Sequence, residues 1–354
     1  MEILDSVGSK IKFGFLKYSL GLVLTKEKKS CPKMALALSI CHDSIYRFLY
    51  KANSFLPLFP SIMISIVRGH ATVKNPGYLI IDETFFSKQF ATFLEGVFNM
   101  FNAAMGRQER GLMLVVMAWS NGAATIPITF RWLFHKDLVG NDYKTKSEIA
   151  KELLLEYKNK IPFDHFLVDG HYSTIYLMRF LVDQSIHFVA KFPINRVITT
   201  KDGEKNQLRD HSRLKLLRNC RSRSTKAIFN GMELYVSAHK RKMRNGEFAF
   251  TYIVSNICLQ TKEYLQRYER RWKIEIMFRT MKQSLGLQHC QARSLFRQEA
   301  HISAVFFSYS FLQNEKEKHN LKNSELVIKA LEKLKLDELD QRITRFGANF
   351  DQVA

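Results

Sequence analysis

The chain has 354 residues, and its hydrophobic content of 46% and charged content of 25% are ordinary for a globular protein. These values exclude wholesale disorder and collagen-like repeats. The charge balance is unusual, because 54 lysines and arginines face 33 aspartates and glutamates and leave a net charge of +21. A surface this basic attracts polyanions, so a nucleic-acid partner is expected.

Residues 1–75 show helical patterning and no strand alternation. Within them, Pro32–Leu49 resembles a helix-turn-helix, in which a small residue lets two helices cross and branched or aromatic residues pack between them. The positions that carry this pattern are Ala35, Ser39–Ile40 at the turn, Ile45 and Phe48, with Ser39 standing where glycine is usual. An ordinary helical hairpin fits the same residues, so a DNA-binding role for this region stays open.

The same region holds the longest apolar stretch, Phe55–Val67, which is interrupted by two prolines. Spanning a bilayer takes about 20 apolar residues, so no membrane segment is expected. The five cysteines include no CxxC pair, which argues against a disulfide framework and a zinc motif. A reduced, cytoplasmic location is predicted.

Residues 76–192 alternate between apolar runs and helical segments. Strands are predicted at 78–82, 111–119, 124–133, 163–169 and 187–192, and helices at 146–157 and 174–182. Asn121-Gly122 lies between the second and third runs and predicts a hairpin. An antiparallel three-strand meander followed by parallel crossovers is the element order of a ribonuclease-H-like core, a mixed five-stranded sheet with helices.

Residues 193–258 do not continue that order. Between 191 and 250, 15 lysines and arginines face 5 acids, about half of the net charge of the chain. Alternating segments with Asn-Gly turns predict a basic, β-rich insertion, and Arg218, Arg221 and Arg223 are its phosphate-binding candidates. A solvated charged face is the alternative.

The remaining residues are predicted to be mainly helical, with the last dozen loose. A long helix over 261–285 occupies the segment 259–295, and helices over 297–315 and 323–339 form a C-terminal region, 296–354. At about 100° per residue, four polar side chains of the long helix share a stripe within about 60°. They are Tyr268, Arg271, Glu275 and Lys282.

Two aspartates follow neighbouring strands of the predicted sheet. Asp82 ends the first strand and Asp169 ends the fourth. Parallel strands lie about 4.8 Å apart, so the two carboxylates meet at the carboxyl edge of the sheet. Like charges at that spacing repel unless cations lie between them, and oxygen ligands suit Mg²⁺ or Mn²⁺.

These motifs together resemble the bacterial insertion-sequence DDE transposases, in particular the subgroup with a β-strand insertion before the last acid. Tyr268-x2-Arg271-x3-Glu275-x6-Lys282 matches its Tyr-Arg-Glu-Lys signature. Asp82-Glu83-Thr84 resembles the first-acid motif, and Asp169-Gly170-His171-Tyr172 the second. The resemblance covers roughly residues 75–295; the ends of the chain match it only in helical character.

The resemblance implies that Asp82, Asp169 and Glu275 bind two Mg²⁺ or Mn²⁺ ions, which activate water or a DNA 3′-hydroxyl for attack on a phosphodiester. It also implies DNA partners, namely transposon ends and target, and a homodimer in the synaptic complex. Tyr268, Arg271 and Lys282 would hold phosphates at the transposon end. Two departures concern DNA contacts: His171 stands where relatives often have arginine, and the insertion has no tryptophan to stack a flipped base. Stacking is therefore expected from Trp272, Phe229 or Tyr235.

Other interpretations of the sequence remain. A ribonuclease-H-like nuclease or resolvase would cut without joining, and a decayed element would only bind DNA. For Arg271 there are also two alternatives. As an ordinary ion pair it would stabilise the helix, whereas as a phosphate ligand at an exposed position it would matter little to the free protein.

Overall fold

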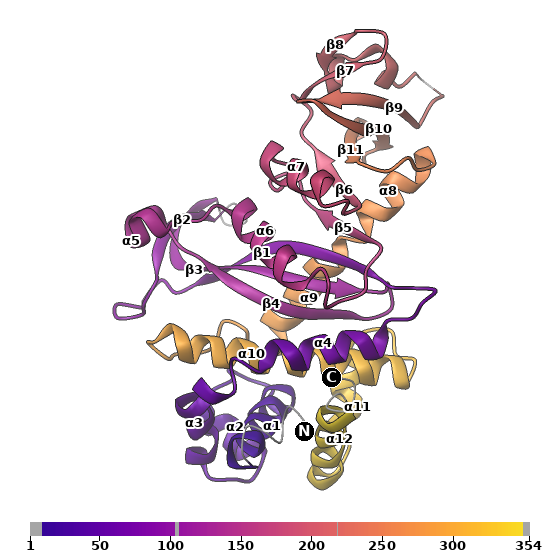
Figure 1. Ribbon diagram of the computed structural model, residues 1–354. Coiled ribbons are helices and arrows are strands. Elements are labelled where there is room, and N and C mark those ends of the chain that lie inside the picture. Colours follow the sequence, from indigo (N-terminus) through magenta and orange to yellow (C-terminus); the bar gives the residue numbers. More distant parts are fainter. Residues whose placement is uncertain (1–8, 103–105, 218, 350–354) are drawn as a thin grey trace.

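The computed structural model describes residues 9–102, 106–217 and 219–349. Figure 1 shows an elongated molecule with the first and last helices at one end, the strands of the insertion at the other, and the larger strands between them. Among the described residues, no helix combines the length and the apolar character needed to cross a membrane.

The N-terminal region is helical, as its pattern predicts. Its helices are α1 (Ser9–Leu24), α2 (Cys31–Ala37), α3 (His42–Lys51) and α4 (Phe59–His70), with a short 3₁₀ turn at Ala52–Ser54. Ser39, between α2 and α3, has a φ of +53°, the left-handed conformation for which glycine is the usual residue. Ala35, Ile45 and Phe48 are buried, so the predicted packing of the two helices is confirmed.

Six strands form the central part of the sheet. They are β1 (Tyr78–Ser87), β2 (Phe98–Asn102), β3 (Arg107–Ser120), β4 (Thr125–Leu133), β5 (His165–Val168) and β6 (Phe188–Phe192). β3 pairs antiparallel with β1, β2 and β4, whereas β5 runs parallel to both β1 and β6. The expected Asn121-Gly122 hairpin joins β3 to β4, and the mixed α/β class is confirmed.

The sheet is larger than the five strands expected. Its further strands are β7 (Val197–Thr200), β8 (Lys205–Gln207), β9 (Ser222–Phe229), β10 (Met232–Lys242) and β11 (Phe248–Ser255). β11 pairs antiparallel with β6, so the described residues form one 11-stranded sheet. The reason is physical: the outer edge of β6 would otherwise present unpaired backbone groups.

Helices cover both faces of the central strands. α4, α10 (Leu295–Lys318) and α9 (Trp272–Gln283) pack against β4, and α9 also packs against β1, whereas α6 (Lys146–Tyr157) packs against β3. Figure 1 shows α4 and α10 below the sheet and α6 above it. The other helices are α5 (Lys136–Val139), α7 (Ile175–Asp183), α8 (Thr261–Glu269), α11 (Ser324–Leu331) and α12 (Leu336–Asn349), with 3₁₀ turns at Gly140–Asp142, Leu208–Asp210 and Ser212–Leu214.

Two helix predictions are wrong in the same way. The helix expected over 261–285 divides into α8 and α9, because the backbone tightens at Arg271: its N–H bonds to the Tyr268 carbonyl, three residues back, at 2.9 Å. The helix expected over 323–339 likewise divides into α11 and α12. Helical periodicity continues through a one-turn break, so a sequence pattern does not reveal it.

The predicted end of β1 is also wrong. The strand does not stop at Asp82 but continues to Ser87, because β3 supplies a partner along its whole length. Of the residues of β1, only Tyr78, Leu79 and Ile80 pair with β5. Asp82 therefore lies where β1 has lost its parallel neighbour but is still held by its antiparallel one.

Trp119 fixes the start of this strand pair. Its indole Nε1 donates to the carbonyls of Pro76, just before β1, at 2.9 Å and of Pro162, before β5, at 3.0 Å. The ring packs so closely on Gly77 that a Cβ there would lie 2.5 Å from it, and the φ of Gly77 is +80°. One buried side chain therefore joins the entries of the two strands that lead to Asp82 and Asp169.

We expect Trp119→Phe to lower the free energy of unfolding by about 1–3 kcal/mol, because two buried carbonyls lose their donor. Urea unfolding followed by circular dichroism measures this. Trp272→Phe is the control, since Trp272 is 51% exposed and its replacement should change stability little. Equal effects of the two substitutions would contradict the proposed role of the indole.

Candidate active site

The register of β1 and β5 places two predicted site residues side by side. Ile80 pairs with Leu167 in the parallel ladder. Asp82 stands two residues further along β1, and Asp169 stands two residues beyond Leu167, directly after the end of β5. Successive side chains alternate in direction along a strand, so both carboxylates leave the same face at the edge where β5 ends.

Arg271 links Asp82 to Glu275. Its Nη1 donates to Asp82 Oδ2 at 2.8 Å, and its Nη2 donates to Glu275 Oε1. The side chains of Arg271 and Asp82 are only 13% and 15% exposed. The premise that Arg271 is an exposed residue is therefore wrong, because its guanidinium is largely buried between two carboxylates.

Arg271 lies at the turn between α8 and α9. Its guanidinium carbon lies 5.7 Å from the centre of the Tyr268 ring. At the far end of α9, Lys282 Nζ donates to the Phe85 carbonyl of β1 at 3.0 Å, and burial lowers the pKa of Lys282. The polar stripe thus faces β1 along its length, while the apolar stripe (Ile274, Met277, Phe278, Met281 and Leu285) is buried as predicted.

Asp169 is oriented by its own turn. Its Oδ1 accepts hydrogen bonds from the backbone N–H of His171 at 2.9 Å and of Tyr172 at 3.3 Å. This local capping is typical of an aspartate that follows a strand. The ring of Tyr172 is buried beneath the turn, whereas His171 is exposed.

The pKa of Asp82 is shifted by burial and by neighbouring charges. Burial raises its pKa to about 7, the charges of Glu83 and Asp169 push in the same direction, and Arg271 opposes them. An aspartate that is hard to ionise beside two other carboxylates is a group that a cation would stabilise.

Sequence reasoning missed two residues beside Asp82. Glu83 pairs with Lys146, the first residue of α6. Its second oxygen, Oε2, is buried and has no hydrogen-bond partner among the described residues. Glu83 belongs to the motif Asp82-Glu83-Thr84, so the sequence offered a signal that it lies at the site. Nothing in the sequence around Lys146 indicates that this residue contacts β1.

The donor chemistry fits a hard divalent cation. Asp82, Asp169 and Glu275 offer carboxylate oxygens, the ligands that Mg²⁺ and Mn²⁺ prefer. Across the described ranges, however, no three His, Cys, Asp or Glu side chains gather closely enough to hold an ion. Between Asp82 and Glu275 stands the Arg271 guanidinium, an internal cation that donates a hydrogen bond to each.

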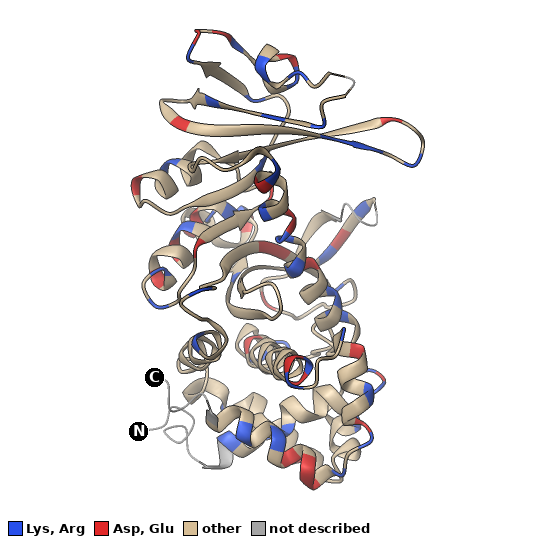
Figure 2. Ribbon diagram, turned by 90° about the vertical axis from the view of Figure 1, so that its right-hand side faces the viewer, with Lys and Arg blue, Asp and Glu red and all other residues tan. Residues whose placement is uncertain are grey.

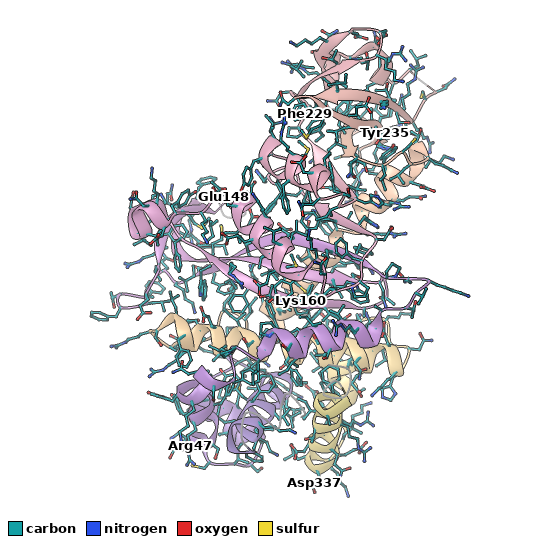
Figure 3. All side chains as sticks on the ribbon, in the orientation of Figure 1. Arg47, Glu148, Lys160, Phe229, Tyr235 and Asp337 are labelled. Carbon is teal, nitrogen blue, oxygen red and sulfur yellow. The ribbon has the colours of Figure 1, made fainter. Side chains whose placement is uncertain are left out.

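The other predicted site residues lie elsewhere. Trp272 is half exposed at the start of α9. Phe229 is buried against Phe192, with ring centres 5.0 Å apart, so its expected stacking on a base is wrong. Tyr235 is half-buried; Figure 3 shows it with Phe229 in the insertion, at the end of the molecule opposite Arg47 of α3.

The basic residues of the insertion lie on its strands and on the loops between them, as Figure 2 shows. Arg221 is exposed and Arg223 is half-buried on β9. Neither forms an ion pair with another residue that the structure describes. Arg218 lies outside the described residues.

Comparisons with known families agree with this geometry. A family model described as DDE superfamily endonuclease matches residues 10–215, which include Asp82 and Asp169. A second, described as Transposase DDE domain, matches residues 130–311, which include Asp169 and Glu275. The chain matches no curated protein.

The pKa of Asp82 leads to a prediction about stability. An unfolded aspartate titrates at about 3.9, whereas burial raises the pKa of Asp82 to about 7 in the folded protein. Between these pH values the unfolded chain releases this proton and the folded protein keeps it, so the folded state loses stability as the pH rises. Its contribution to stability is complete below pH about 4 and is lost as the pH rises through 7. Asp82→Asn avoids this loss, so without divalent ions its stability relative to the unsubstituted protein should rise between pH 5 and 7, by at most about 1.4 kcal/mol per unit.

Urea unfolding in EDTA at several pH values measures this difference. Asp164→Asn is the control, because Asp164 precedes β5 and its pKa is lowered, through its hydrogen bond to His165 and despite partial burial. Its effect on stability should not change between pH 5 and 7. If the stability difference between Asp82→Asn and the unsubstituted protein is also independent of pH in this range, Asp82 ionises normally.

Proposed function

The chain belongs to the DDE transposases and endonucleases, and we propose that it is a cut-and-paste enzyme: it cleaves DNA at the ends of an insertion sequence and joins the freed 3′-hydroxyl to target DNA. The proposal places it in the subgroup with the Tyr-Arg-Glu-Lys signature. The observation that carries it is the meeting of Asp82 on β1 and Glu275 on α9 at one guanidinium, with Asp169 directly after β5 and close enough for its charge to act on Asp82.

The strand order supports a ribonuclease-H-like core. β4, β3 and β1 form an antiparallel meander, and β5 and β6 follow in parallel. We assign this core to residues 76–192 and 259–295, the β-rich insertion to 193–258, and helical regions to 1–75 and 296–354. In open α/β sheets, sites lie beyond the carboxyl ends of the parallel strands, where Asp169 stands.

Asp82, Asp169 and Glu275 would hold two Mg²⁺ or Mn²⁺ ions. Such a pair lowers the pKa of a water, or activates a 3′-hydroxyl, and stabilises the leaving oxygen of the phosphodiester. Within the chain, the backbone N–H groups of His171 and Tyr172 keep Asp169 oriented. Trp119 keeps the two strands in register.

Arg271 has a second role in this proposal. Once Asp82 and Glu275 have other cations as partners, its guanidinium is available for a phosphate of the transposon end, to which its fork geometry is suited. Tyr268 lies beside that guanidinium, Lys282 lies on the same side of α9, and Trp272 is exposed next to them. A homodimer would bring two such sites to the paired ends.

A strand-transfer assay with Mg²⁺ tests the proposal. Its substrate is the DNA that flanks the coding sequence, with the terminal repeats of the element at its ends. Joined products support transposition. Cleavage without joining would indicate a nuclease. The family model described as DDE superfamily endonuclease favours this alternative. Binding without cleavage would indicate a decayed element.

We expect Asp82→Asn, Asp169→Asn and Glu275→Gln each to abolish cleavage while leaving binding of the transposon end largely intact, because each removes a ligand charge and preserves shape. Gel shift and cleavage assays on the same preparations separate the two effects. Asp164→Asn, at the other end of β5, should cleave normally. Loss of end binding in all three acid variants would point instead to a structural role.

The insertion should contact DNA phosphates through arginines that lack an ion-pair partner among the described residues. Arg221→Ala with Arg223→Ala should weaken end binding and reduce the slope of log affinity against log salt by up to about 0.9 per lost contact. The control is Arg209→Ala with Arg213→Ala, since these two already pair with Asp210 and Asp202 at 3.3 and 3.1 Å. If both pairs of substitutions change the slope equally, position within the insertion does not decide phosphate binding.

A further inference from the structure

A cavity of about 290 Å³ lies between the N-terminal helices and the segment that leads into α10. Tyr46 and Tyr50 of α3 line one side, and His289, Arg293 and Arg297 line the other, with Lys29 from the turn after α1. None of these residues belongs to the carboxylate site. The cavity is therefore separate from the carboxylate site.

Its charge is entirely positive. None of the described residues that line it is acidic. Lys29, Arg293 and Arg297 form no ion pair with any acidic residue in the described part of the chain. Lys29 is 6% exposed and burial lowers its pKa to about 8, while Arg297 Nε is buried without a hydrogen-bond partner in the described part of the chain. Glu332, whose charge also acts on Lys29, is paired with Lys26 at 3.2 Å. Arg293 is exposed and Arg297 is half-buried. A buried ammonium and a partly buried guanidinium that lack anionic partners favour an anionic ligand.

Its aromatic rings are available to a ligand. Tyr46 and Tyr50 lie one helical turn apart on α3 and are 41% and 57% exposed. The guanidinium of Arg297 lies 3.8 Å from the centre of the Tyr50 ring, and that of Arg293 lies 5.2 Å from the centre of the Phe93 ring, which is 73% exposed. Flat aromatic and guanidinium groups next to cations are the surface on which unpaired bases stack.

The cavity is also tied to the strand that carries Asp82. Lys88 Nζ, just past β1, donates to the carbonyls of Gln288 at 2.9 Å and Cys290 at 2.7 Å, and Gln288 Nε2 donates to the Phe85 carbonyl at 3.3 Å. Lys88 is six residues beyond Asp82, a separation of roughly 20 Å along a strand. A DNA strand could therefore reach the carboxylates and the cavity together.

We propose that this cavity binds an unpaired nucleotide of the DNA strand, with its base stacked on Tyr46 and Tyr50 and its phosphate held by Lys29, Arg293 and Arg297. The ligand class is thus single-stranded DNA. This inference rests on the proposed function, since it takes DNA as the substrate, but it concerns a surface away from the cleavage site and does not require cleavage.

The test uses the full chain and a single-stranded oligonucleotide that contains one 2-aminopurine, whose fluorescence falls when it stacks. Binding to the unsubstituted protein should quench it. Tyr50→Ala should weaken binding about tenfold or more and reduce the quenching, whereas Tyr50→Phe should retain both. Arg297→Lys, which keeps the charge but loses the planar group, should bind weakly in the same way.

Tyr176→Ala is the matched control. Tyr176 is 47% exposed and has a lysine, Lys151, 5.0 Å from its ring centre, but it lies on α7. Its replacement should leave oligonucleotide binding unchanged. Melting temperatures of all variants show whether they are folded.

The outcomes separate this inference from the proposed function. Asp82→Asn should bind the oligonucleotide normally even though it does not cleave. If Tyr50→Ala and Arg297→Lys bind like the unsubstituted protein, the cavity proposal is overturned and the transposase proposal stands. If Tyr50→Ala weakens a duplex of the same sequence as much as the single strand, the cavity contacts backbone only and the unpaired-nucleotide proposal is overturned. If the cavity variants behave as expected but strand transfer fails, only the proposed function falls.

Discussion

The arrangement of the candidate site depends on one interaction, the pairing of Arg271 with Asp82 and Glu275. Carboxylates that lie close together and largely out of water repel each other, and the net charge of +21 spread over the chain does little to relieve them. A cation has to stand among them. In the free protein that cation is a side chain, and it connects β1 to a helix 189 residues later in the chain.

This constraint also explains which parts of the site the sequence predicts. Asp82 and Asp169 were predictable because strands alternate and parallel strands align their ends, both of which are local or repeating features. The helical stripe of Tyr268, Arg271, Glu275 and Lys282 follows from periodicity in the same way. The partners of the stripe were not predictable, because spacing along a helix gives the face of a residue but not what packs against that face. Arg271 was therefore assigned an exposed position that it does not have.

The larger errors share a second cause, which is that strands and helices end where their neighbours end. β1 passes Asp82 because β3 continues beside it, and the sheet passes β6 because β11 occupies that edge. Neither neighbour is close in sequence to the residue it affects. Phe229 illustrates the consequence: its strand looks like an amphipathic surface strand, but pairing through β11 and β10 brings its ring against Phe192, into the core.

The distribution of cations suggests how DNA would lie on the molecule. Lys282 donates to the Phe85 carbonyl of β1, whereas Lys88, just past β1, donates to the carbonyls of Gln288 and Cys290. Burial lowers the pKa of both lysines, and their hydrogen bonds serve the fold. The cations without an ion-pair partner among the described residues include Arg221 in the insertion and Arg297 in the cavity beside α3. Figure 1 shows β9 and α3, which carry or adjoin these groups, near opposite ends of the molecule, with β1 between them. A DNA strand that contacts both ends would pass the central strands, so phosphate binding at the ends would bring the DNA near the strand that carries Asp82.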